Sequence, residues 1–406
     1  MKNKFKLSTL IFPILLSACS SSDQDDTSQI STLLPDAQKK VLVDTGIAFA
    51  NQINPADHQE FIETMQTLAD LMESYPLEEA GNQRFAAFAR SIARVVKKNN
   101  PNALPEVGRA ISEVVSIDEY LGVYRFDASR KVWVFTAGGD NLQAIFLANG
   151  KEAQIVVTPS KDFVSVEVEG DEVHIPVRIE TTITRGGNPV ASLHNAVELT
   201  DANATEAIRL KIGGYVWQAD LYMSATQARG VFDMNKDNAL LLSANAHVAG
   251  TNLGDIFEGN ATENNFAEAK ASCSVMNTIQ LDSECSNVGL LIRKTDKIED
   301  DYQNGTDFTT EAEKKYATDM ANCINEYVTS RLFTENKAAA DVLMQPYVEV
   351  EEYYGNRYEY WDYEPVLLFY SDQSKHSLED FFNENDFGKV IDDFKALYDR
   401  YQIYFK

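Results

Sequence analysis

The sequence predicts an α+β protein in which an antiparallel β-meander of eight to ten strands is flanked by N- and C-terminal helical segments. Apolar residues recur at helical spacing before residue 117 and again towards the C-terminus, whereas between residues 118 and 249 they alternate with polar residues. A period near 3.6 is typical of an amphipathic helix, and a period of two is typical of a strand with one covered and one wet face.

Residues 1–18 have the features of a secretory signal peptide. Lys2, Lys4 and Lys6 precede a short apolar run over residues 7–16. Ten residues span about 15 Å as a helix, which is too short for a bilayer core of about 30 Å. A basic head, a short apolar centre and small residues before a cleavage point therefore indicate export rather than a membrane-spanning helix.

The end of this segment, Leu16-Ser17-Ala18-Cys19, resembles the lipobox of bacterial lipoproteins. The resemblance covers only the signal region. It implies cleavage before Cys19, acylation of that residue with palmitate-like chains, and a membrane partner through the lipid anchor. Ser20 stands where Asp retains enteric lipoproteins at the inner membrane, which implies the outer membrane and leaves its periplasmic and surface-facing sides both open. The alternative is an ordinary signal peptide with a chance cysteine.

Residues 19–35 are predicted to be a flexible acidic tether. The stretch is polar and acidic and has few large apolar groups. Such a composition cannot bury enough surface to fold. The tether would join the anchor to the folded part of the chain.

Composition and charge limit the partners. The chain has 406 residues, 44% of them apolar, and a formal net charge of −26. An acidic surface repels phosphate backbones, which argues against nucleic acid as a partner. It favours cations or basic proteins as partners, or it serves only to keep the protein soluble. No stretch after the signal peptide approaches 18 apolar residues, so no transmembrane helix is predicted.

Residues 36–116 are predicted to be helical. Phe61, Met65, Leu68 and Met72 recur at steps of four, three and four, which places them on one stripe. Core packing is the ordinary role of such a stripe. The alternative is a partner-binding or membrane-lying helix.

Residues 117–250 are predicted to form the meander. Between 163 and 180, Val and Ile alternate with other residues on both sides of EGDE, which predicts a hairpin with its apolar side chains on one covered face. The motifs ANGK (148–151), RGGN (185–188) and MNKDN (234–238) mark further turns. Such alternation requires something apolar against one face: a second sheet, helices or a ligand.

Residues 251–345 are predicted to be a second helical segment, and residues 346–406 a β-hairpin followed by a terminal helix. The turn of that hairpin is expected within YYGNRY (353–358). The terminal helix is expected to carry Phe387, Ile391, Phe394, Leu397 and Tyr398 as its apolar residues.

Besides Cys19, the chain has Cys273, Cys285 and Cys323. Exported proteins fold in an oxidising compartment, which predicts one disulfide from Cys285, either to Cys273 or to Cys323, and one remaining thiol. The spacings match no zinc pattern.

A weak candidate for a metal site lies in DMNKDN, where Asp233, Asn235 and Asp237 occupy the first, third and fifth places of a calcium loop. Asn238 stands where that loop needs glycine, and Ala244 stands where it needs a bidentate glutamate. A hairpin turn between two strands explains the motif better, so no metal and no cofactor are predicted.

The stretch 347–365 combines aromatic rings with carboxylates, which are the materials of a sugar-binding surface or of a site that holds a cation over the rings. The alternative is a strand pair with half-buried rings and exposed acids. The candidate ligand surface consists of Tyr353, Tyr354, Tyr358, Tyr360, Trp361 and Tyr363.

No catalytic residue is predicted. The five histidines are scattered, and the chain has no Gly-x-Ser-x-Gly elbow, P-loop or Gly-x-Gly-x-x-Gly motif. A dispersed triad stays open, because triads assemble in space. The favoured function is an envelope-anchored, non-enzymatic binding or structural module with an unknown ligand or protein partner. One alternative is a surface glycan-binding lipoprotein that uses the 347–365 aromatics. The other alternative is a hydrolase without a recognisable motif.

Overall fold

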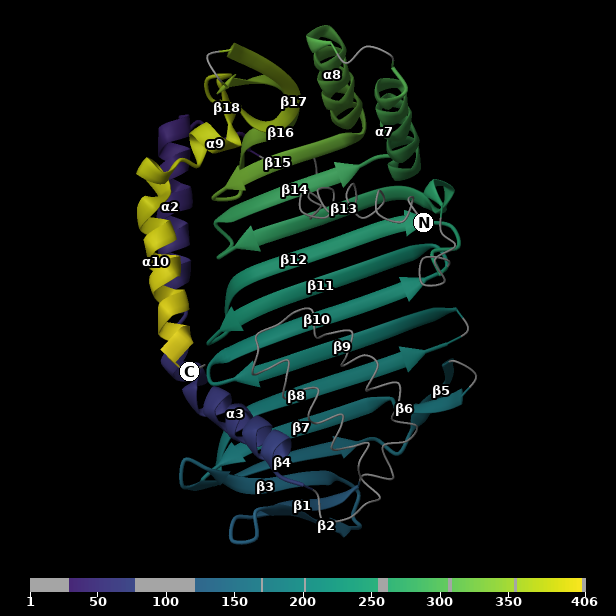
Figure 1. The fold of residues 1–406 in the computed structure, drawn as a ribbon, viewed down its shortest axis with the longest axis vertical. Coiled ribbons are helices and arrows are strands. Elements are labelled where there is room, and N and C mark those ends of the chain that lie inside the picture. The colour runs from purple at the N-terminus through teal and green to yellow at the C-terminus, as the bar shows by residue number, and fades with distance from the viewer. Residues whose placement is uncertain are drawn as a thin grey trace. The chain divides into compact units, whose positions relative to one another are not determined.

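The computed structural model describes residues 29–76, 121–168, 171–200, 202–254, 262–305, 309–353 and 356–403 (Figure 1). It confirms an α+β fold with a large antiparallel sheet and with helices towards both termini. The chain divides into a first unit, Met1–Gln52 with Leu221–Phe394, and a second unit, Ile53–Asp220 with Lys395–Lys406. Strand β10 (Tyr215–Ser224) and helix α10 (Glu384–Gln402) each belong partly to both units.

The second unit is a meander packed on one helix. Its strands neighbour one another in the order β2-β1-β3-β4-β7-β8-β9-β10, with β1 and β3 parallel. Helix α3 (Gln59–Ser74) follows the short 3-10 helix η1 (Pro55–His58). The strands besides β10 are β1 (Gly122–Asp127), β2 (Val132–Ala137), β3 (Leu142–Ala148), β4 (Lys151–Pro159), β7 (Arg178–Arg185), β8 (Asn188–Leu199) and β9 (Asn203–Ile212).

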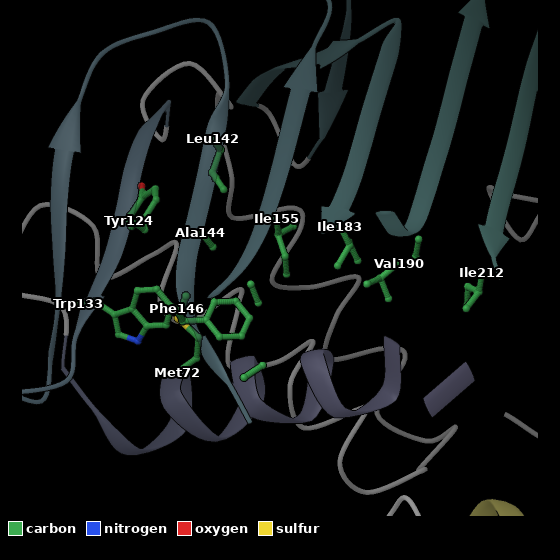
Figure 2. Packing of buried hydrophobic residues seen from close by; sticks show 13 residues of the cluster. Met72, Tyr124, Trp133, Leu142, Ala144, Phe146, Ile155, Ile183, Val190 and Ile212 are labelled. Atoms are coloured by element: carbon green, nitrogen blue, oxygen red, sulfur yellow. The ribbon is translucent and has the colours of Figure 1, made fainter. Parts of the chain in front are cut away.

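Helix α3 buries the stripe that its sequence predicts. Met72 is buried beside Trp133 and Phe146, and the other three members of the stripe are partly buried against the same core (Figure 2). The indole Nε1 of Trp133 donates to the carbonyl of Leu71 at 3.3 Å. The stripe is therefore a core face. Residues 77–116 of the predicted helical segment lie outside the described residues.

The predicted hairpin turns are confirmed. Each of the three motifs places two residues with positive φ between paired strands: Asn149 and Gly150, the two glycines of RGGN, and Asp237 with Asn238 (50° and 69°). Turns of this kind match the right-handed twist of the flanking strands, and Asn, Asp and Gly tolerate them best.

The hairpin predicted at 163–180 is confirmed only as far as Pro176. Strands β5 (Phe163–Val168) and β6 (Asp171–Pro176) pair with Val164 opposite Ile175, but they form a separate two-stranded sheet. Because proline cannot donate to a ladder, β6 ends there and Ile179 lies in β7 of the other sheet. The prediction that the apolar side chains from residue 164 to residue 179 share one covered face is therefore wrong. The described part of residues 117–250 holds twelve strands rather than eight to ten.

The first unit combines strands β11 to β18, which neighbour one another in chain order, with helices. The strands are β11 (Gln227–Lys236), β12 (Ala239–Gly250), β13 (Phe266–Val275), β14 (Ile279–Cys285), β15 (Val328–Thr334), β16 (Lys337–Tyr353), β17 (Asn356–Phe369) and β18 (Lys375–Ser377). The helices are α2 (Pro35–Gln52), the 3-10 helix η5 (Glu263–Asn265), α7 (Val288–Gln303), α8 (Thr310–Tyr327), α9 (Leu378–Phe381) and the part of α10 up to Phe394.

The prediction of a helical segment over 251–345 is wrong in part. Helices α7 and α8 lie there, but so do strands β13, β14 and β15. In β13, Ala269, Ala271 and Cys273 alternate with Lys270 and Ser272. Alanine and lysine favour helices in isolation, so pairing with the neighbouring strands overrides the local preference.

The prediction of a flexible tether over residues 19–35 is wrong for residues 29–35. Ile30 forms a parallel bridge with Ala338 of β16, and α2 begins at Pro35. Ser31 is 2% exposed. Residues 29–35 are therefore part of the first unit, and residues 19–28 lie outside the described residues.

The predicted C-terminal hairpin and helix are present, and the hairpin is longer than expected. Strand β16 begins at Lys337, and its pairing with β17 closes at Tyr353 opposite Asn356, around the predicted turn. In α10, Leu397 is buried, and the rings of Phe49 and Phe394, with centroids 6.0 Å apart, pack α2 against α10. Tyr398 is 60% exposed, so the predicted apolar face of this helix is only partly covered.

Candidate functional site

The sheet of the first unit separates apolar from polar side chains by face. The register places Ala246 of β12 between Gly230 of β11 and Ala271 of β13. It places Ala244 between Phe232 and Cys273 in the same way. Directly opposed residues share a face, so small and apolar side chains line one face across three strands.

Helices cover this apolar face near both ends of the strands. Helices α7 and α8 pack on Ala269 and Cys285 at one end. Helices α2 and α9 pack on Leu332 and Phe369 at the other. The two covers bury the outer parts of the face over β13 to β17.

Beside these covers, on β11 to β13, lies what we call the alanine strip: Gly230, Phe232, Ala244, Ala246 and Cys273. All five are half-buried. Small side chains allow another apolar group to approach the sheet closely. Burial raises the pKa of the Cys273 thiol, so it stays protonated and the strip carries no charge.

Two buried hydroxyls interrupt the covered part of this face. Ser283 of β14 lies opposite Ser330 of β15, and their Oγ atoms are 2.7 Å apart. Both side chains are buried. Because each hydroxyl provides a hydrogen-bond partner for the other, neither needs a ligand to satisfy it.

The opposite face of the same strands carries charged side chains that pair with one another. Lys270 and Glu284 are 3.2 Å apart, and Arg331 and Asp341 are 3.3 Å apart. The hydroxyl of Tyr370 also donates to Asp341. Burial and this hydrogen bond raise the pKa of Tyr370 to about 12, so the phenol stays neutral at physiological pH. These groups form ion pairs and hydrogen bonds with one another and do not form a reactive site.

The described rings of the predicted aromatic surface lie on both faces of the hairpin. In the β16–β17 hairpin, Trp361 lies opposite Val348, whereas the neighbouring Tyr360 lies opposite Glu349 on the other face. Tyr360 is 45% exposed. Tyr363 lies on the same face as Trp361, because alternate residues of a strand point the same way.

Helix α8 packs on the side of the hairpin that carries Trp361 and Tyr363. Lys314 Nζ lies 4.9 Å from the centroid of the Trp361 ring, and the Tyr316 ring lies 6.4 Å from that of Tyr363 at an edge-to-face angle. Both rings of the hairpin are half-buried. They therefore serve packing, as the alternative reading of this stretch expects. The side chains of Tyr353, Tyr354 and Tyr358 lie outside the described residues.

The weak metal candidate is a hairpin, as preferred from the sequence. Asp233 and Asn235 lie in β11, and Asp237 lies in its turn. An extended strand followed by a two-residue turn does not wrap its side chains around one ion as a calcium loop does. Within the described residues, no group of three or more His, Cys, Asp or Glu side chains could hold a metal ion.

The disulfide prediction is not confirmed, because Cys273, Cys285 and Cys323 are free in the structure. Cys285 lies opposite Ala269. Cys273 is four residues further along that strand, about 13 Å away, whereas a bridge requires Cα atoms within about 7 Å. Cys323 shares a core cluster with Cys285, and burial raises the pKa of both thiols.

Sequence reasoning missed a contact between a serine and a histidine beside β18. Ser374 Oγ lies 3.0 Å from His376 Nε2, and it donates to Asp372 Oδ1 at 2.7 Å. The alternation Asp-x-Ser-x-His was the signal in the sequence. In a triad the carboxylate orients the imidazole, but here Asp372 also accepts from the Ser374 backbone N–H at 3.0 Å. That geometry is an Asp-capped turn.

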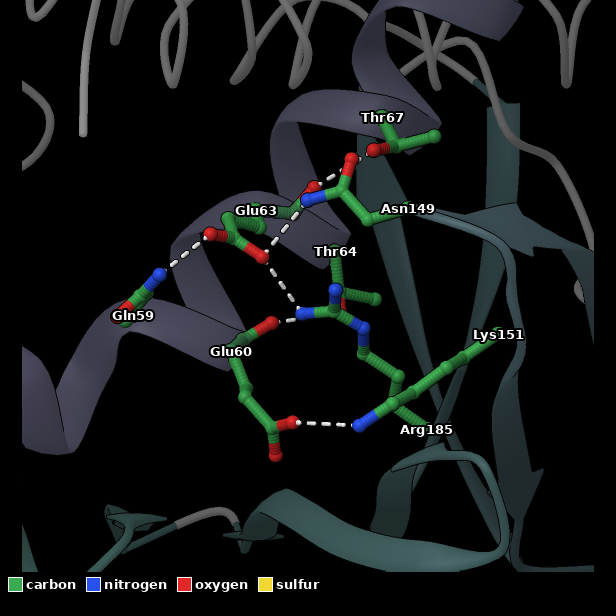
Figure 3. A network of polar contacts seen from close by, with 8 residues as sticks. All are labelled: Gln59, Glu60, Glu63, Thr64, Thr67, Asn149, Lys151 and Arg185. Atoms are coloured by element: carbon green, nitrogen blue, oxygen red, sulfur yellow. Dashed lines mark hydrogen bonds and ion pairs between the residues drawn. The ribbon is translucent and has the colours of Figure 1, made fainter.

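A polar network ties α3 to two hairpins of the second unit (Figure 3). The carboxylate of Glu63 accepts hydrogen bonds from Gln59 at 2.7 Å and from Asn149 and Arg185 at 2.8 Å each. Burial raises the pKa of Glu63, but these three donors outweigh it and leave the pKa below its usual value. The network positions α3 on the sheet, and no local pattern in the sequence indicates it.

His58 is a packed core histidine of the second unit. Its Nδ1 lies 2.6 Å from the hydroxyl of Tyr401, and its ring centroid lies 4.5 Å from that of Tyr215 and 5.5 Å from that of Trp217. The side chain is 6% exposed. It holds the end of the C-terminal helix against η1.

No helix among the described residues is both long and apolar enough to cross a membrane. The scattered site candidates resolve into packing and turns, whereas the alanine strip is an apolar part of the described sheet that stays half-buried. No protein-family model, curated protein or solved structure matches this chain. The resemblance of residues 16–19 to a lipobox and the geometry of this face are therefore the two features that point to a function.

Proposed function

We propose that this chain is a lipoprotein of the bacterial outer membrane, anchored through acylated Cys19, and that its sheet is a non-enzymatic binding module for an apolar ligand. The alanine strip carries the proposal. Its half-buried apolar side chains lie on a face whose neighbouring parts are covered by helices. An apolar group on the strip would gain about 25 cal/mol for each Å² of apolar surface removed from water.

The two alternative functions have less support. A glycan-binding surface needs rings that are exposed together, and the described rings of 347–365 are divided between two faces. A hydrolase needs an oriented base, and the hydroxyl of Ser374 already donates to Asp372. A binding module needs neither feature.

A neutral fluorescent probe, N-phenyl-1-naphthylamine, tests the strip directly, because its emission rises in apolar surroundings. Ala246→Gln should weaken probe binding by about fivefold, which corresponds to roughly 1 kcal/mol, because it buries an amide without a partner. Fluorescence titration of the purified protein measures this change.

Ala249→Gln is the matched control. Ala249 lies on the same strand but on the polar face, opposite Gln227 and next to Glu268 in register. The same substitution there should leave probe affinity within about twofold. Equal effects of the two substitutions, or no probe binding by the unchanged protein, would remove the strip as a binding site.

A further inference from the structure

The N-terminal end of the described chain is held to the first unit by a short parallel strand. The backbone N–H of Ser31 donates to the carbonyl of Ala338 at 2.8 Å, and the N–H of Ala338 donates to the carbonyl of Gln29 at 3.0 Å. Ser31 Oγ accepts from Gln38 Nε2 at 2.7 Å, and Gln38 in turn accepts from the hydroxyl of Thr334. Backbone pairing and a series of buried side-chain hydrogen bonds therefore hold residues 29–31 in place, and we call these residues the fixed point.

This fixed point lies close to Cys19 in the sequence. Ten peptide units join Cys19 to Gln29, and they span at most about 35 Å when fully extended. An acylated Cys19 would lie at the membrane surface. Whatever conformation the intervening residues adopt, they keep Gln29 within that distance of the bilayer.

The side chains beside the fixed point suit a bilayer surface. Ser31 is buried, whereas Ile30 and Leu34 are 60% and 57% exposed. Lys337, the first residue of β16, is exposed next to the bridge at Ala338. Aliphatic side chains beside a cation fit the boundary between acyl chains and anionic headgroups.

We propose that this edge of the first unit, residues 30–34 with Lys337, faces the lipid bilayer that holds Cys19; the inference rests on the acylation proposed above. Helix α7 packs at the other end of the strands, where Cys285 lies opposite Val328. Strand β14, of seven residues, spans about 20 Å between these ends. The α7 end of the first unit therefore points away from the membrane.

Two matched cysteine substitutions test the orientation in the full-length acylated protein. Lys337→Cys lies at the proposed edge, and Lys297→Cys lies on α7, where the lysine side chain is 74% exposed. The protein is reconstituted into phosphatidylethanolamine–phosphatidylglycerol vesicles, and each thiol is titrated with a bulky polyethylene-glycol maleimide. The unsubstituted protein gives the background from the native thiols, which burial keeps protonated and slow.

On vesicles, the cysteine at position 337 should react several-fold more slowly than the one at position 297. A long glycine–serine linker inserted after Asp26 should abolish that difference, because the anchor then no longer limits the distance. Equal rates in protein that sediments with the vesicles would overturn this inference and leave the anchoring intact. Protein that carries no palmitate and does not sediment would overturn both. Protection at 337 that persists with the long linker would indicate a second copy or another protein on this edge and would also overturn the assignment to the bilayer.

Discussion

Arg185 is 5% exposed and carries a full positive charge, so its counter-charge decides whether α3 can pack on the sheet. Glu63 supplies that charge at 2.8 Å, and its own remaining lone pairs are used by Gln59 and Asn149. A buried ion pair stabilises a fold only when such additional hydrogen bonds complete it. At the residue scale, the position of α3 therefore depends on one carboxylate.

Glu63→Gln should lower the free energy of unfolding by about 2 kcal/mol, because it leaves the buried guanidinium without a counter-charge. Glu60→Gln is the matched control on the same helix, since Glu60 pairs with Lys151 at 3.5 Å in an exposed position. It should cost no more than about 0.5 kcal/mol. Urea unfolding followed by the fluorescence of the buried tryptophan measures both, and equal losses would contradict the role given to Glu63.

The same pair predicts a pH dependence. The pKa of Glu63 is lower in the folded chain than its usual value of 4.5. The stabilisation is therefore complete above that value and is lost as the pH falls through the lower, folded pKa. The difference in unfolding free energy between the unchanged protein and Glu63→Gln should be constant near neutral pH and should shrink below pH 4.5. A difference that stays constant in acid would show that the carboxylate charge is not what stabilises α3.

At the scale of elements, two-residue turns determine the register of the hairpins and hence which side chains share a face. Asp237 and Asn238 both adopt positive φ between β11 and β12, and Glu335 and Asn336 do so between β15 and β16. A slip of one residue would exchange the apolar and polar faces of a strand. The alanine strip therefore exists only in the register that these turns specify.

Asn238→Ala should destabilise the protein by about 1 kcal/mol, because a Cβ without a hydrogen-bonding side chain is strained at a φ of 69°. Asn238→Gly should be neutral or slightly stabilising, since glycine adopts this region without strain. Thermal or urea unfolding compares the two variants. If alanine and glycine behave alike, the turn does not control this hairpin.

At the scale of the whole molecule, the chain combines a proposed lipid anchor with a proposed binding face. The proposed lipid anchor is Cys19, and the β-bridge at Ile30 lies eleven residues further along the chain. The sheet itself is fully used for packing where helices cover it and is half-open along the alanine strip. The described residues that follow the proposed anchor and the proposed binding face thus belong to the same first unit.

Cys19→Ala should abolish incorporation of labelled palmitate and release the protein from washed membranes, because a single short apolar segment cannot replace several acyl chains. Cys273→Ala is the control, since it changes another cysteine and leaves the lipobox intact. Fractionation after radiolabelling measures both. Labelled Cys19→Ala protein that still sediments with membranes would rule out the anchor.

The sequence by itself determined the elements whose signal is local. Alternation and turn residues specified the hairpins around Asn149 and Asp237, and the spacing from Phe61 to Met72 specified the buried stripe of α3. These features depend on neighbours within a few residues, so they can be read without the fold. The same holds for the hairpin interpretation of DMNKDN, which needed only its missing glycine and glutamate.

Only the tertiary structure decided the features that depend on pairing with another segment. The local sequence of β13 favours a helix, and its pairing with β12 and β14 makes it a strand. The local sequence around Ile30 favours a tether, and the hydrogen bonds between Ala338 and the neighbours of Ile30 make it part of the sheet. The separation of Cys285 from Cys273 was set by the register of β13 against β14, and the partners of Trp361 and Tyr360 were set by the register of β16 against β17. Register and burial are properties of pairs of segments rather than of one segment, and a single sequence carries no local mark of which segments will pair.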